Sequence, residues 1–130
     1  MSEALQLTIY GKVPSKSSSR IIVKNRRTGM PMVISSAMTR QYEKDFEKQV
    51  LGHQKGKFTD DDRLRINLFW FTDSYRQDVD APAKAIFDNL QKCGVIVNDN
   101  RIDEYQIARF IDKDNPRVMI QILKLEKANG

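Results

Sequence analysis

The sequence predicts one mixed α/β (α+β) domain over residues 1–130, with a mixed β-sheet of about five or six strands and two main helices. Three observations lead to this prediction. A chain of 130 residues has the length of one domain. Short apolar runs rich in β-branched and aromatic residues recur along it, as in strands. Two segments with apolar residues at helical spacing, at about 36–51 and between Asp80 and Gly94, interrupt those runs.

Composition narrows the class of protein. Hydrophobic residues make up 40% and charged residues 30% of the chain, which is ordinary for a soluble globular protein. No stretch of 18 apolar residues and no leader pattern is present, so we expect neither a membrane span nor export. The single cysteine, Cys93, cannot form an internal disulfide, which fits a reducing cytoplasm. A net charge of +5 favours a polyanionic partner.

The first strand and the basic segment after it come from simple patterns. Leu5, Leu7 and Ile9 alternate with polar residues, which predicts a half-buried strand. The following segment, 12–27, contains no acidic residue and three consecutive serines, so it is either a phosphate-binding surface or a solvated basic loop. Its basic residues, the candidate DNA contacts, are Lys12, Lys16, Arg20, Lys24, Arg26 and Arg27.

A hairpin and a helix follow. Residues 20–24 and 31–34 flank a polar turn with Gly29, which predicts a hairpin. Ser35 or Ser36 is a plausible N-cap for a helix running to about Leu51. An apolar stripe on this helix predicts that it packs on a sheet, and its members are Ala37, Met38, Tyr42, Phe46 and Val50.

The middle of the chain predicts a turn and then a central strand. Asp60, Asp61 and Asp62 are interpreted as a turn, and His53 as a surface residue with no partner at ligand spacing. Residues 63–72 form a strand that is apolar on both faces toward its end, which predicts cover on both sides. Two later strands, 104–112 and 117–125, are joined by an Asp-Asn-Pro turn and predict an antiparallel hairpin.

Acidic residues with chemical potential lie between those strands. Asp78 and Asp80 are two apart, so in an extended segment both carboxylates point the same way. Lys84 follows one helical turn later, and Asp99 follows after the helix has ended at Gly94. We therefore expect three acids and a lysine to converge. Carboxylates without His or Cys suit Mg²⁺ or Mn²⁺ rather than Zn²⁺.

Each of these residues also has a structural explanation. Asp80 precedes Ala81-Pro82, an ordinary helix start. Lys84 and Asp88 can be a surface i,i+4 pair, and Asp99 can be a turn residue within Asn98-Asp99-Asn100. Only the combination favours a metal site.

At this point the residues resemble a known family, the RusA-type Holliday junction resolvases, which are small phage and prophage endonucleases. The family pattern of Asp-x-Asp-Asn, Lys, Asp, Gly, a hydrophobic run and Asp-Asp is matched by Asp78-Val79-Asp80-Ala81, Lys84, Asp88, Gly94 and Asn98-Asp99. Ala81 and Asn98 depart from it, and neither removes a carboxylate of the matched triad. The opening Gly11-x-x-Pro14-x-Ser-Lys16 is similar to the family's basic stretch.

The resemblance implies a function and a set of site residues. Asp78, Asp80 and Asp99 would bind Mg²⁺, and Lys84 would join them as a catalytic residue. A homodimer would act on four-way DNA junctions in recombination and repair, with no small-molecule cofactor. Further phosphate contacts are expected from Arg76, Arg101 and Arg109.

Two alternatives remain open from the sequence. One is a non-catalytic, structure-selective DNA-binding protein whose acids are structural. The other is a Mg²⁺-dependent nuclease that prefers flaps or other branched DNA.

Overall fold

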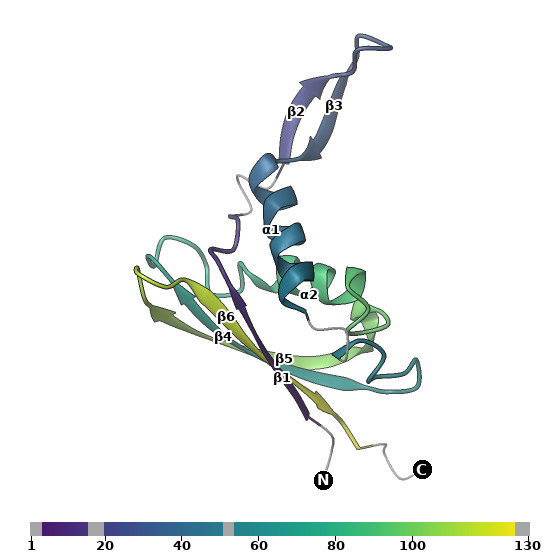
Figure 1. Ribbon diagram of the computed structural model, residues 1–130, viewed down its shortest axis with the longest axis vertical. Helices are drawn as coiled ribbons and strands as arrows, with labels where there is room; N and C mark the ends of the chain where they lie inside the picture. Colours follow the sequence, from purple (N-terminus) through teal and green to yellow (C-terminus); the bar gives the residue numbers. More distant parts are fainter. Residues whose placement is uncertain (1–3, 16–19, 51–53, 127–130) are drawn as a thin grey trace.

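The computed structural model describes residues 4–15, 20–50 and 54–126 of the chain. It shows an α+β fold with six strands and two α-helices among these residues (Figure 1). In chain order the elements are β1 (Ala4–Tyr10), β2 (Arg20–Lys24), β3 (Pro31–Ser35), α1 (Ala37–Gln49), β4 (Leu64–Thr72), α2 (Ala83–Lys92), the 3-10 helix η3 (Asp99–Arg101), β5 (Ile102–Ile111) and β6 (Arg117–Lys124).

The strands form two separate sheets. Four of them make a mixed sheet in the order β1-β6-β4-β5, and β2 and β3 make an antiparallel hairpin. β4 and β5 are parallel, because α2 carries the chain back across the sheet between them. β6 is antiparallel to both of its neighbours, β1 and β4. The prediction of a mixed sheet with two helices is therefore confirmed, with the six strands divided four and two.

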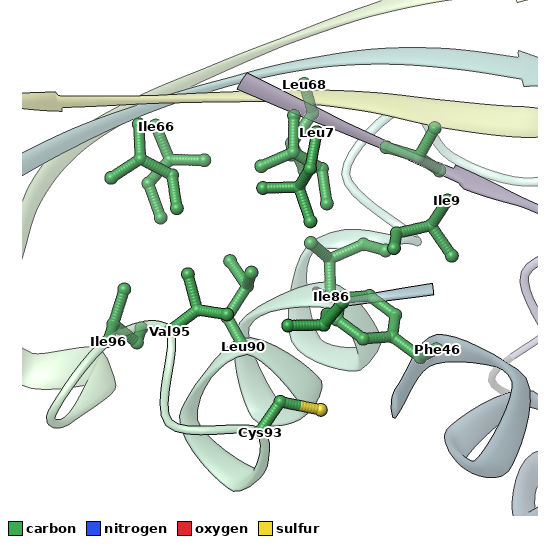
Figure 2. Close-up of a cluster of buried hydrophobic side chains, with 14 of the residues drawn as sticks. Leu7, Ile9, Phe46, Ile66, Leu68, Ile86, Leu90, Cys93, Val95 and Ile96 are labelled. Carbon is green, nitrogen blue, oxygen red and sulfur yellow. The ribbon is translucent and has the colours of Figure 1, made fainter. Parts of the chain in front are cut away.

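The core lies between the four-stranded sheet and the two helices. Figure 2 shows Phe46 of α1 and Ile86 and Leu90 of α2 directed toward sheet residues that include Leu7 and Leu68. All five are buried. Burial of such side chains contributes roughly 1.5–3 kcal/mol each relative to exposure, so this layer holds both helices on the sheet.

The helix limits follow the capping signals in the sequence. Ser36 is the N-cap of α1, and its hydroxyl accepts a hydrogen bond from Thr39 N at 3.1 Å. Tyr42, Phe46 and Val50 are buried as predicted, whereas Met38 and Ala37 are exposed. That part of the predicted stripe is wrong, because the first turn of α1 extends beyond the edge of the sheet toward the hairpin (Figure 1).

The predicted antiparallel hairpin of the last two strands is wrong. β5 and β6 do not pair with each other, because β4 lies between them. The turn at 112–116 does reverse the chain, and Asn115 N donates to Asp112 Oδ1 at 3.2 Å. Turn chemistry specifies the reversal but not the strand beside which the chain returns.

The predicted cover on both faces of β4 is also absent from the described part of the chain. Leu64, Ile66, Leu68 and Trp70 face the helices and are buried. On the other face, Phe69 is 38% exposed. We call this second side the open sheet face. It is defined by the outward positions of the four strands, with Thr8, Met119, Phe69 and Ala108 in one row and Tyr10, Arg117, Phe71 and Phe110 in the next.

Candidate active site

The loop after β4 is anchored to neighbouring strands before it reaches the acidic residues. Lys12 Nζ donates to Asp73 Oδ2 at 2.8 Å, which ties the segment after β1 to this loop. This hydrogen bond, followed by the charge attraction of Lys12, lowers the pKa of Asp73. Asp112 N also donates to Thr72 O at 2.8 Å, so the last residue of β4 is held as well.

Arg109 of β5 provides the second anchor. Its guanidinium lies 5.6 Å from the ring centroid of Trp70 and 5.1 Å from that of Tyr75. Its Nη1 donates to the carbonyl oxygen of Gln77, the residue before Asp78. A guanidinium that lies over two rings and donates to a main-chain carbonyl ties this loop to β5.

Asp78 and Asp80 lie in two consecutive turns. Ala81 N donates to Asp78 O at 3.0 Å, and Ala83 N donates to Asp80 O at 3.1 Å. The strand has ended at Thr72, so the prediction that this pair occupies an extended segment is wrong. Both residues are nonetheless exposed, and neither carboxylate forms a hydrogen bond or ion pair with the described residues.

The start of α2 excludes the main structural explanation for Asp80. The N-cap residue is Pro82, and no side chain caps the helix. Asp80 contributes its main-chain carbonyl to the turn and leaves its carboxylate in solvent. The side chain is therefore available for a cation, and it makes no capping hydrogen bond to the helix.

Lys84 lies on the exposed side of the first turn of α2. Asp80 and Asp88 are four residues before and after it, yet within the described residues Lys84 forms an ion pair with neither. The surface pair suggested by the spacing is thus not formed. Lys84 therefore follows Asp80 by four residues, with an ammonium that forms no ion pair to a described residue.

Asp99 lies at the other end of α2. Its main-chain N donates to Oε1 of Gln91, in the last turn of that helix, at 3.0 Å. A helix of ten residues rises about 15 Å, so a distance of that order separates Asp99 from the Asp78–Asp80 pair. The described residues contain no group of three acidic, His or Cys side chains placed to hold a metal ion. The expected convergence of three acids is absent from the single chain.

The two ends of β4 explain this separation. Because β4 and β5 are parallel, the chain leaves β4 at one edge of the sheet and enters β5 at the opposite edge. Asp78 and Asp80 follow the exit from β4, whereas Asp99 precedes the entry to β5. Sequence spacing alone gives no indication of which edge a residue reaches.

The predicted DNA contacts fall into three groups. Lys24, Arg26 and Arg27 are exposed on the β2–β3 hairpin, and Arg76 is exposed in the loop before Asp78. Lys12 is bound to Asp73, and Arg101 and Arg109 are half-buried, with Arg101 Nε 3.3 Å from Asp60 Oδ1. The third group, Lys16 and the side chain of Arg20, lies outside the described residues. His53, which the sequence predicts to be a surface residue, also lies outside them.

The anchoring role of Arg109 was not apparent in the sequence. Its partners Trp70, Tyr75 and Gln77 are more than thirty residues away, and no local pattern connects them. The only indication in the sequence is that Arg109 alternates with the apolar residues Ile107 and Ile111 on one face of the predicted strand.

Fold and site together define a small α+β protein with a solvent-exposed carboxylate pair at a helix start and a separate basic hairpin. The chain matches the family model described as Endodeoxyribonuclease RusA over residues 12–123. It therefore belongs to the RusA family of endodeoxyribonucleases, whose activity is the cleavage of Holliday junctions in DNA recombination and which generally depend on divalent metals. No curated protein sequence matches the chain significantly. Among the described residues, no helix is long and apolar enough to span a membrane.

Proposed function

We propose that this protein is a Mg²⁺-dependent endodeoxyribonuclease that resolves Holliday junctions by paired phosphodiester hydrolysis. The observation that carries the proposal is the pair Asp78 and Asp80, exposed and unengaged in an anchored loop. Membership of the RusA family supplies the class of substrate. We infer a cytoplasmic location from the free, buried Cys93 together with a DNA substrate.

The donor set fits a hard divalent cation. Mg²⁺ takes one or two carboxylates and completes its shell with water and substrate phosphate oxygens, so Asp78 and Asp80 suffice as protein ligands. Mn²⁺ accepts the same ligands. When bound, the metal supplies polarisation of a phosphoryl oxygen and a lower pKa for a coordinated water. The proposal for Asp99 as a third ligand rests on the motif match alone.

The side chains of the chain have separate roles in this proposal. Asp78 and Asp80 would hold the divalent cation, and the position of that cation would fix where the scissile phosphate docks. Lys84 places its ammonium beside that phosphate and offsets negative charge on the leaving oxygen. Arg109 does not meet the substrate and instead holds the loop in place, and Arg76 contacts a neighbouring phosphate.

A homodimer is part of the proposal because a four-way junction requires two cuts. A C₂ dimer supplies two identical sites in one complex. The open sheet face is a suitable surface for the second copy, since it exposes Phe69, Phe110 and Met119, and Phe69 and Met119 line a hollow of about 500 Å³. Its ionic residues neutralise one another, with Arg65 paired to Glu104 and Arg117 paired to Asp112.

The decisive experiment replaces Asp80 by Asn. We expect junction cleavage in Mg²⁺ to fall by at least about 10², because a neutral amide is a poor ligand for a hard cation. Thermal stability should not change, since the carboxylate caps nothing. Junction affinity in Ca²⁺ or EDTA should be kept or increase, because one negative charge near the phosphates is lost.

Further variants serve as controls and comparisons for Asp80→Asn. Asp61→Asn makes the same chemical change at an exposed acid in a turn before β4 and should cleave normally. Lys84→Ala should lose about 10²–10³ in rate while it still binds. Asp99→Asn tests whether Asp99 is a third metal ligand. Normal cleavage by this variant would mean that Asp78 and Asp80 alone form the metal site. Full activity of Asp80→Asn would contradict the proposal.

A further inference from the structure

The β2–β3 hairpin stands apart from the rest of the molecule. It forms one end of the long axis and projects beyond the start of α1 (Figure 1). Among the described residues, its only extensive packing is between its own two strands. A two-stranded hairpin of this kind is at best marginally stable in water without something to cover it.

Its strands nevertheless expose apolar side chains. Ile22 is 74% and Val33 61% exposed, and the two are direct cross-strand partners. Met30 at the turn is 64% exposed and Met32 40%. An apolar cluster of this kind on a projecting arm indicates a binding surface.

The tip of the hairpin has a defined shape and is basic. Asn25 Oδ1 accepts hydrogen bonds from Arg27 N at 2.8 Å and Thr28 N at 3.3 Å, and Asn25 N donates to Met30 O at 2.8 Å. Lys24, Arg26 and Arg27 are exposed there, without an ion pair to any described residue. The arm thus presents cations next to an apolar pair.

The distribution of charge along the chain indicates which kind of partner binds this surface. Residues 1–42 carry seven Lys and Arg and a single acid, which gives +6, and no acid occurs between Glu3 and Glu43. Residues 43–130 carry fifteen basic and sixteen acidic residues, which gives −1. The excess positive charge of the chain therefore lies on the arm and its flanks. Two such arms would repel each other, whereas DNA is complementary to them.

We propose that the β2–β3 hairpin is an arm that enters the branch point of the DNA. In this proposal Lys24, Arg26 and Arg27 bind phosphates of the flanking duplexes. Ile22 and Val33 pack against base faces that are exposed where the strands exchange. Apolar wedges in continuous duplex must first unstack a base step, at a cost of a few kcal/mol, whereas in the open, metal-free form of a junction the base pairs that border the branch are not stacked on one another. The arm would therefore favour branched DNA over duplex. The inference rests on the proposed function.

The test measures binding in EDTA, so that no cleavage step enters the result. A synthetic four-way junction and a linear duplex of the same sequence are compared, each with 2-aminopurine beside the position of the branch. We expect the pair Ile22→Ser and Val33→Ser to lower junction affinity about tenfold, to change duplex affinity less than twofold, and to abolish the fluorescence change at the branch. The exchange Ile22→Val with Val33→Ile keeps the apolar volume and should behave as the parent protein.

A second set of variants distinguishes the contribution of charge to DNA binding from that of apolar contact. Replacing Lys24, Arg26 and Arg27 by Ala should weaken binding to junction and duplex alike. The slope of log affinity against log salt should fall by about 0.9 per lost phosphate contact. Equal loss on both DNAs, or no loss, for the serine pair would overturn the proposal. A change of oligomeric state in the serine pair by sedimentation would also overturn it, because the apolar pair would then face a second copy. A parent protein that fails to prefer or cleave junctions would overturn the proposed function as well.

Discussion

At the scale of single residues, the most informative side chain is one that does no chemistry. Arg109 joins β5 to the acidic loop through Trp70, Tyr75 and the carbonyl of Gln77. Loops are the most mobile parts of a fold, and a carboxylate pair can hold a cation only if its main chain is fixed. The position of Asp78 therefore depends on a residue from a different strand.

Replacing Arg109 by Lys tests this dependence. Lysine keeps the charge but lacks the planar guanidinium that lies over the two rings, and it cannot reach the carbonyl with the same geometry. We expect faster hydrogen exchange in residues 73–80 and a several-fold increase in the Mg²⁺ concentration needed for half-maximal cleavage. Saturating Mg²⁺ should restore most of the rate. A rate loss that Mg²⁺ does not restore, with unchanged exchange, would instead assign Arg109 to substrate contact.

At the scale of elements, local signals predicted the strands and helices well and their arrangement poorly. α1 begins after the N-cap hydroxyl of Ser36, and α2 ends before Gly94 with its positive φ, as the sequence indicated. The strands at 4–10, 64–72 and 117–124 also follow their alternation. Such signals act within a few residues. They could not show that β4 separates β5 from β6, or that Asp99 reaches the opposite edge of the sheet from Asp80.

The cap of α1 allows a quantitative test at this scale. Ser36→Ala removes the hydrogen bond to Thr39 N and should lower the free energy of unfolding by about 1 kcal/mol. Ser36→Asp retains a cap and adds a negative charge to a helix with no acid in its first turn, so it should match or exceed the parent. Denaturant titrations with equal m-values measure both. If Ser36→Ala were as stable as the parent protein, the N-terminus of α1 would be held by packing alone.

At the scale of the whole molecule, the surfaces divide by chemistry. Positive charge lies on the arm, the unengaged carboxylates lie at the start of α2, and the open sheet face combines exposed apolar side chains with amide side chains and paired charges. Four strands about 4.8 Å apart and eight residues at about 3.3 Å cover on the order of 500 Å². Two copies together would bury about 1,000 Å² or more, which reaches the lower limit for a specific interface.

The final prediction concerns that face. Phe69 and Met119 are direct neighbours at its centre, and a charge placed there would be buried without a partner on formation of a sheet-to-sheet dimer. We expect Phe69→Arg to convert a dimer to a monomer by sedimentation at micromolar concentration, with little change in the melting temperature of the subunit. Val97→Arg changes an exposed apolar residue between α2 and η3 in the same way and should remain dimeric. The monomer should still bind a junction through its arm but should lose coordinated double cleavage, leaving nicked intermediates that gel electrophoresis resolves. A Phe69→Arg protein that remains dimeric would place the interface elsewhere. A parent protein that is monomeric would remove the dimer from the proposal while leaving the Asp78–Asp80 site to its own test.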